Sequence, residues 1–62
     1  MHLMQRAVLT VNENGNIRNH KVLDLSYDEE LKAFFYVYRG SATCTLREHV
    51  LGYRERNSSD DA

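Results

Sequence analysis

The chain has 62 residues, of which eight are Lys or Arg and nine are Asp or Glu, so its formal net charge is −1. This length allows one domain, and the near-balanced charge argues against a strongly basic, non-specific nucleic-acid binder. The sequence has no apolar run of membrane-spanning length and no basic-then-apolar leader, so we expect no membrane segment and no secretory signal. Together with a lone cysteine, these features predict a cytoplasmic protein.

Two extended runs separated by a turn open the chain. Leu3 to Val11 and Ile17 to Leu25 both contain alternating apolar residues, which predicts two strands. Between them, Asn12 to Asn16 is a dense cluster of turn-forming residues that includes Asn-Gly, a strong hairpin signal. The first 25 residues therefore predict a β-hairpin.

The register of this hairpin depends on the length of its loop. A two-residue loop at Asn14-Gly15 pairs Leu9 with His20, which sets an apolar residue opposite a polar one. A three-residue loop with a left-handed glycine pairs Val11 with Ile17 and gathers the apolar residues on one face. We therefore prefer the three-residue loop.

The next segment has a helix start signal, a periodic middle and a helix stop signal. Ser26 and Glu29 match a capping box, and Arg39 followed by Gly40 matches a helix end. One apolar face follows the helical spacing, through Tyr27, Leu31, Phe34, Phe35 and Tyr38. These signals predict a helix over Tyr27–Arg39.

A strand is the alternative for the same segment. Ala33 to Tyr38 is rich in aromatic and β-branched residues, which favour strands. Gly40-Ser41 would then be a hairpin loop that leads into the next strand. We prefer the helix because it uses both caps and the acidic first turn.

A third strand is expected over Ala42–Leu46, with Ala42, Cys44 and Leu46 facing the core. A second capping box in residues 45–48 leaves a short helix over residues 45–52 as an alternative. Residues 57–62 are polar and acidic, which predicts a disordered tail after a domain of residues 1–56.

The predicted fold class is therefore α+β, in the order β-β-α-β, with one helix packed on a three-stranded antiparallel sheet. So short a chain buries only about 60% of its unfolded surface and has little stability to spare. No internal disulfide can form from a single cysteine, so we expect a homodimer. The alternative is a monomer that is stable only together with its partner.

No motif for catalysis or for a cofactor is present in the sequence. His2, His20 and His49 are too far apart for a local metal site, and Cys44 is expected in the core as a small apolar residue. We therefore expect no enzyme activity, no cofactor and no metal.

The tyrosines and arginines of the second half are the best candidates for contact with a partner, because both types are enriched at interface hot spots. We predict a partner-binding surface made of Tyr36, Arg39, Arg47, Tyr53 and Arg54. The leading hypothesis is a small, non-enzymatic accessory or inhibitory protein, of the type encoded by phages or mobile elements, that acts through protein–protein contact.

The alternative is a dimeric nucleic-acid-binding regulator. It would use Arg6, Arg18 and Lys21 on the outer face of the sheet, or the C-terminal arginines.

Overall fold

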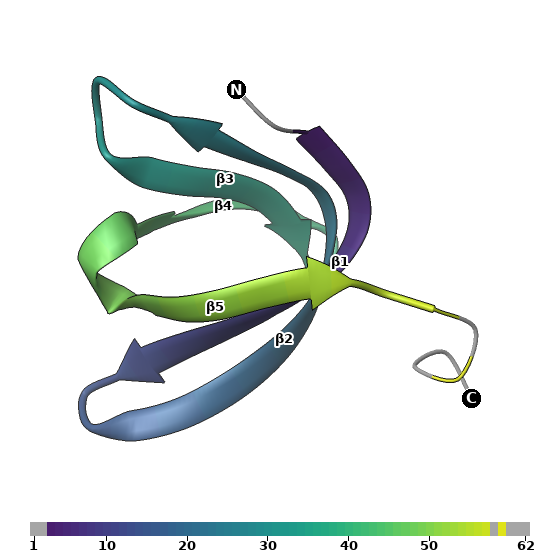
Figure 1. Ribbon diagram of the computed structural model, residues 1–62, viewed down its shortest axis with the longest axis horizontal. Helices are drawn as coiled ribbons and strands as arrows, with labels where there is room; N and C mark the ends of the chain where they lie inside the picture. Colours follow the sequence, from purple (N-terminus) through teal and green to yellow (C-terminus); the bar gives the residue numbers. More distant parts are fainter. Residues whose placement is uncertain (1–2, 58, 60–62) are drawn as a thin grey trace.

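A computed structural model describes residues 3–57 and 59 and consists almost entirely of antiparallel strands (Figure 1). The sheet has the strand order β4-β3-β2-β1-β5, and a 3-10 turn, η1, connects β4 to β5. The elements are β1 (Leu3–Glu13), β2 (Asn16–Asp28), β3 (Ala33–Tyr38), β4 (Ser41–Leu46), η1 (Arg47–His49) and β5 (Val50–Glu55).

The first hairpin is confirmed, but its predicted register is wrong. Leu9 lies opposite His20, as a two-residue loop requires, and both loop residues are left-handed, with φ 56° at Asn14 and 87° at Gly15. This turn matches the right-handed twist of the strands. The side chain of Asn12 also accepts a hydrogen bond from the N–H of Gly15 at 2.8 Å.

The predicted helix over Tyr27–Arg39 is wrong, and with it the α+β class. Strand β2 continues to Asp28, whose Oδ1 accepts from the N–H of Leu31 at 3.0 Å, and Lys32 closes the turn with φ 51°. Acidic residues before an apolar run therefore form a turn here instead of a helix start.

Residues 33–38 form β3, as in the strand alternative, and the hairpin loop that follows is Arg39-Gly40. Both loop residues have positive φ, 52° and 78°. Aromatic and β-branched side chains fit a half-buried pleated strand, which outweighed the helix signals.

Strand β4 is confirmed as a strand, but its faces are reversed. Ala42, Cys44 and Leu46 are exposed, and Thr43 and Thr45 are partly buried. The reversal follows from Tyr36 on β3, whose buried hydroxyl lies 2.5 Å from Oγ1 of Thr45. The alternative helix over residues 45–52 is reduced to η1, after which β5 begins.

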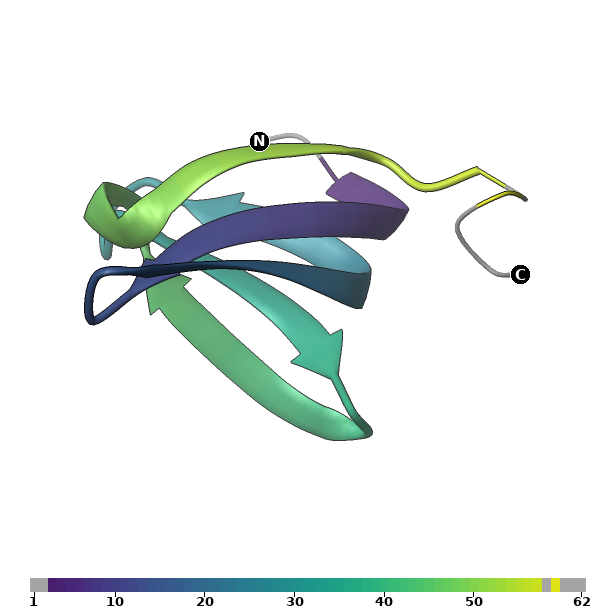
Figure 2. The ribbon, with the colours of Figure 1, turned by 90° about the horizontal axis from the view of Figure 1, so that it is seen from below.

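The sheet curls, and its two edge strands, β4 and β5, converge at the side where η1 connects them (Figure 2). The ring of Phe34 on β3 lies 5.3 Å from the ring of Tyr53 on β5, although β2 and β1 separate these strands in the sheet. Strand β2 allows the curl because Asp24 has φ 52° and the β2–β3 register shifts between Leu23 and Ser26. The core inside the curl contains Ala7, Leu9, Val11, Val22, Leu25, Phe34, Tyr36 and Val50.

Strand β5 closes the fold from the C-terminal side. It pairs with β1 from Ala7 opposite Glu55 to Val11 opposite Val50, and the N–H of Arg56 extends the ladder to the carbonyl of Arg6 at 3.0 Å. Of the predicted tail, residues 58 and 60–62 lie outside the described residues. Within the described chain, no helix is long and apolar enough to cross a membrane.

Candidate functional site

An apolar surface covers the outer side of β2, β3 and β4. Phe35 lies opposite Cys44, and Val37 lies opposite both Leu23 and Ala42. These five residues, which we call the outer platform, therefore come from three adjacent strands and point away from the core. Leu23 is 43% exposed and Phe35 37% exposed, so large apolar side chains contact solvent here.

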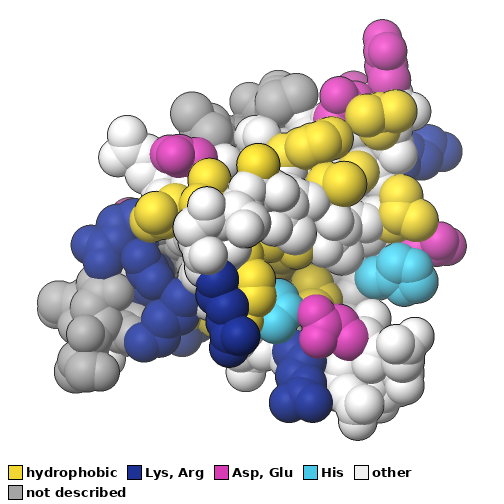
Figure 3. All heavy atoms as spheres, turned by 180° about the vertical axis from the view of Figure 1, so that it is seen from behind, with side chains coloured by type: hydrophobic (Ala, Val, Ile, Leu, Met, Phe, Trp, Pro, Cys, Tyr) yellow, Lys and Arg dark blue, Asp and Glu magenta, His cyan; other side chains and the backbone are white. Residues whose placement is uncertain are grey.

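The outer platform is hollowed along β3 and β4. A hollow of about 340 Å³ is lined by Asp24, by residues 35–37 of β3 and by residues 42–44 of β4. In the view from behind the molecule, hydrophobic side chains form a band across its upper part (Figure 3). A hollow with mainly apolar walls and one carboxylate at its rim suits an apolar side chain of a partner.

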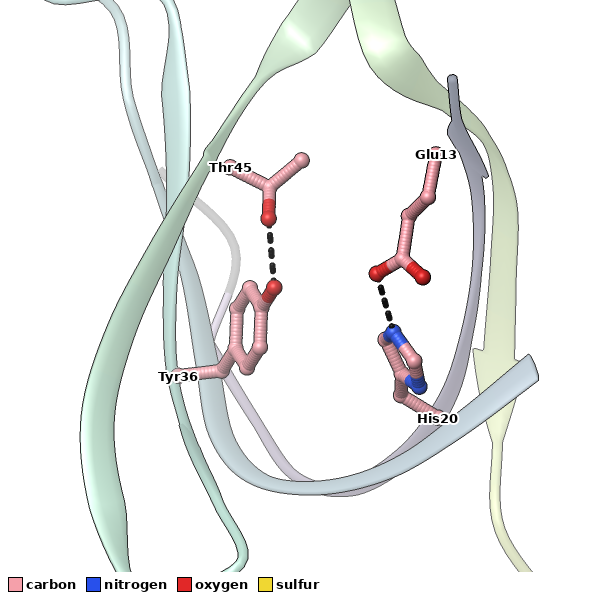
Figure 4. Close-up of polar contacts among 4 residues, drawn as sticks. All are labelled: Glu13, His20, Tyr36 and Thr45. Carbon is pink, nitrogen blue, oxygen red and sulfur yellow. Dashed lines mark hydrogen bonds and ion pairs between the residues drawn. The ribbon is translucent and has the colours of Figure 1, made fainter. Parts of the chain in front are cut away.

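A second hollow lies on the inner side, between β4 and the tip of the first hairpin. It measures about 380 Å³ and is lined by residues 11–14, by residues 44–46 and by His49. Two polar pairs lie on opposite sides of the space between β4 and this hairpin, Tyr36 with Thr45 and His20 with Glu13 (Figure 4).

His20 is the buried polar residue of the described core and is only 9% exposed. Its Nε2 lies 2.8 Å from Oε2 of Glu13, which is a hydrogen-bonding distance, and its ring centroid lies 4.2 Å from that of Tyr38. The Glu13 side chain is 49% exposed, so the carboxylate connects the buried ring to solvent. This pair satisfies a polar side chain opposite Leu9, which explains how the observed register is tolerated.

The five residues predicted to bind a partner do not form one surface. Tyr36 is only 5% exposed and points into the core, so it is not the exposed aromatic residue that helical spacing predicted. Arg39 lies in the β3–β4 turn with its guanidinium over the ring of Tyr38, 5.2 Å from the centroid. Arg47 lies beyond the other end of β4, in η1, where its Nη1 donates to the carbonyl of Val50 at 3.3 Å.

The remaining two, Tyr53 and Arg54, are neighbours on β5 and therefore point to opposite faces. Tyr53 is 46% exposed and lies opposite Leu9, on the core side. Arg54 lies opposite Val8 on the outer side.

Lys21 also lies opposite Val8, from the other neighbouring strand. The outer side of β2, β1 and β5 therefore has a lysine and an arginine on either side of one valine. A hollow of about 330 Å³ lies next to this row, lined by Thr10, Asn19 and residues 51–54 together with Val8. A site of this kind can contact an anion through the two cations of this row.

Cys44 is exposed, contrary to the prediction that it lies in the core. In residues 3–57 and 59, no group of three or more His, Cys, Asp or Glu side chains is placed to hold a metal ion.

Sequence reasoning missed both the outer platform and the Glu13–His20 pair. The signal for the pair was present in the Asn14-Gly15 loop, because its two-residue register places His20 on the core side, opposite Leu9. The signal for the platform was Phe35 opposite Cys44, which required a strand at β3.

Comparisons with protein-family models, with curated proteins and with solved structures found no match to the chain.

Proposed function

We propose that the chain is a small non-enzymatic protein that binds another protein through the outer platform. The observation that supports this function is the exposed apolar area contributed by adjacent strands. Phe35 lies at its centre, between Ser26 on β2 and Cys44 on β4. An accessory or inhibitory role fits a protein that acts through such a surface.

The platform has the features of an interface centre. An aromatic side chain at the middle of an apolar patch is typical of a binding hot spot, and a surrounding polar rim excludes water from it. Asp24 lines the hollow here and supplies such a polar group. The expected partner therefore presents an apolar side chain that fits the hollow beside Phe35.

The test compares two substitutions of exposed apolar residues on different faces. Phe35→Glu places a charge at the centre of the platform, and Leu51→Glu places the same charge beside the hollow on the outer side of β1 and β5. The immobilised proteins are incubated with an extract of the source cells, and the proteins that they retain are identified by mass spectrometry.

We expect the wild type and Leu51→Glu to retain the same protein and Phe35→Glu to lose it, with all three folded by circular dichroism. If Phe35→Glu retains the partner as strongly as the wild type, the platform is not the binding surface.

A second function, contact with a nucleic-acid backbone, is favoured by Lys21 and Arg54 on either side of Val8. In this case binding would weaken steeply as salt rises, in proportion to the phosphates contacted. Lys21→Gln would then reduce the salt dependence, whereas it would leave binding to a protein on the platform unchanged.

A further inference from the structure

The two edges of the sheet differ in how they are protected against pairing. Strand β5 carries Arg54 and Glu55, and its register with β1 shifts between Thr10 and Val11. Charges and bulges of this kind discourage a further strand from pairing with an edge. Strand β4 has the sequence Ser-Ala-Thr-Cys-Thr-Leu, with no charge and no proline, and pairs with β3 in one unbroken register.

The hydrogen bonds of β4 show which of its backbone groups point away from β3. Ala33 lies opposite Leu46, so Lys32 lies opposite Arg47, and the N–H of Arg47 donates to the carbonyl of Lys32 at 2.7 Å. Bonded and non-bonded pairs alternate along an antiparallel ladder. The odd-numbered residues of β4 therefore bond to β3, and the N–H and C=O groups of Ala42, Cys44 and Leu46 point to the open edge.

We propose that β4 pairs antiparallel with β4 of a second copy of the chain, about a two-fold axis at Cys44. Ala42, Cys44 and Leu46 are spaced symmetrically about Cys44. Only a register centred on Cys44 pairs all three within β4: Cys44 opposite Cys44 of the second copy, and Ala42 opposite Leu46. Since each bonded pair exchanges two hydrogen bonds, the three pairs make about six.

The side chains of β4 suit this register. The residues of the outer platform stay on one side of the joined sheet, because paired residues share a face. The platform of one copy therefore continues into that of the other. On the inner side, Thr43 of each copy lies opposite Thr45 of the other, and threonine pairs of this kind stabilise antiparallel sheets.

The charges at the two ends of β4 are complementary. Arg39 precedes the strand and Glu48 follows it, and antiparallel pairing brings the start of each β4 beside the end of the other. Arg47 does not oppose this arrangement, because its guanidinium is turned toward the carbonyl of Val50 in its own chain.

A stable dimer needs more contact area than the edge of β4 alone provides. A stable interface covers roughly 800 Å² of each partner, and the whole chain exposes 4568 Å². The edge of a six-residue strand is smaller than such an interface. The inner hollow of about 380 Å³ is lined in part by Cys44, Thr45 and Leu46 of this edge, so further contact with the second copy is available there.

The first test removes backbone donors at the axis. Cys44→Pro deletes an N–H that points to the open edge and keeps the hydrogen bonds to β3, and proline is tolerated on edge strands. Because Cys44 lies on the axis, the change removes two hydrogen bonds from each dimer. Cys44→Ser is the matched control, since it keeps the N–H and loses only the thiol.

We expect the wild type and Cys44→Ser to sediment as dimers and Cys44→Pro to dissociate at concentrations roughly tenfold or more higher. Cys44→Lys is a second variant that does not depend on proline, because it sets two like charges opposite each other at the axis. We expect it, too, to dissociate at higher concentrations than the wild type. A wild type that is monomeric at every concentration overturns the proposal, and so does a dimer that both variants leave intact.

The second test reads the register directly. The two Cys44 residues would have Cα atoms about 5.5 Å apart, so a short thiol-specific cross-linker should join them in the native protein and fail to do so in denaturant. A Cys44→Ser, Thr45→Cys double variant is the control, because its thiol would lie opposite Thr43 and on the other face. Equal cross-linking of the two proteins would exclude the register.

The dimer extends the proposed function because it enlarges the same outer platform, but the two can fail separately. Phe35 lies on β3, away from the open edge, so Phe35→Glu should abolish partner binding and leave the dimer intact. Cross-linking without any retained partner would leave the dimer standing and remove the proposed function.

Discussion

Removing the Glu13 carboxylate should leave the buried ring of His20 without its hydrogen-bond partner. Loss of one partner of a buried polar group costs about 1–3 kcal/mol. The Glu13 side chain is 49% exposed, so water can replace part of the interaction, and we expect about 1 kcal/mol for Glu13→Ala. In a domain of this size that corresponds to a fall in melting temperature of about 4–8 °C.

His20→Leu should behave differently, because it removes the group that needs a partner. Leucine would lie opposite Leu9 in an apolar environment, and the half-exposed carboxylate of Glu13 can bond to water instead, so no buried polar group is left unsatisfied. The variant also loses the ring contact with Tyr38, so a change below about 1 kcal/mol is expected.

The assay is thermal and urea unfolding of both single variants and the double variant at one protein concentration, because dimerisation makes stability concentration-dependent. In the double variant, Glu13→Ala should have almost no further effect. If His20→Leu destabilises the protein as much as Glu13→Ala does in the wild type, and the double variant shows the sum, the two side chains are not coupled.

Three further substitutions, one of them with a control, test the core and the turns. Leu9→Ala removes a fully buried side chain, so a loss of about 2–5 kcal/mol is expected, and circular dichroism should show a largely unfolded population at 37 °C. Gly15→Ala should lower the free energy of unfolding in urea by about 1 kcal/mol, because Gly15 has a φ of 87°. Gly52→Ala is the control and should be neutral, because Gly52 has no positive φ and no atom lies near the added Cβ. Equal costs for the two variants would contradict the turn geometry. Tyr36→Phe removes the hydroxyl that contacts Thr45 and should cost about 1 kcal/mol, and an unchanged urea midpoint would show that the contact does not stabilise the fold.

The first hairpin was predictable because its signals are local. Two alternating runs and an Asn-Gly turn are sufficient to place β1 and β2, and the structure confirms both. The register was not predictable by counting apolar residues on a face. Placing His20 inside is favourable only because Glu13, seven residues earlier, reaches it, and that contact exists only after the hairpin has formed.

The central segment shows where local signals conflict. Ser26, Glu29, Arg39 and Gly40 all suit a helix, but acidic residues and glycines at the ends of a segment also suit turns. Contacts with residues outside this segment resolve the conflict. Phe35 on β3 lies opposite Cys44 on β4, and Phe34 contacts Tyr53 across the curled sheet. Neither contact can be read from residues 26–40 alone.

The predicted binding surface was wrong because it depended on the predicted helix. The predicted helix placed Tyr36 on the exposed side and Phe35 on the core side. In the observed strand the two are reversed, so Tyr36 is buried and is not available to the predicted binding surface. The inward assignment of Cys44 failed for a related reason, because Thr45 is needed on the inner face to meet the hydroxyl of Tyr36.

The pairing of β1 with β5 has a consequence for how the chain acquires its structure. Ala7 and Glu55 are neighbours in the sheet, so β1 receives its second neighbour from β5, the last of the five described strands to be synthesised. Proteins dominated by such distant pairings fold slowly, in milliseconds to seconds. During synthesis on the ribosome, the edge of β1 that pairs with β5 therefore stays unpaired while β1 to β4 are made. Folding is completed only after residues 50–55 have left the exit tunnel.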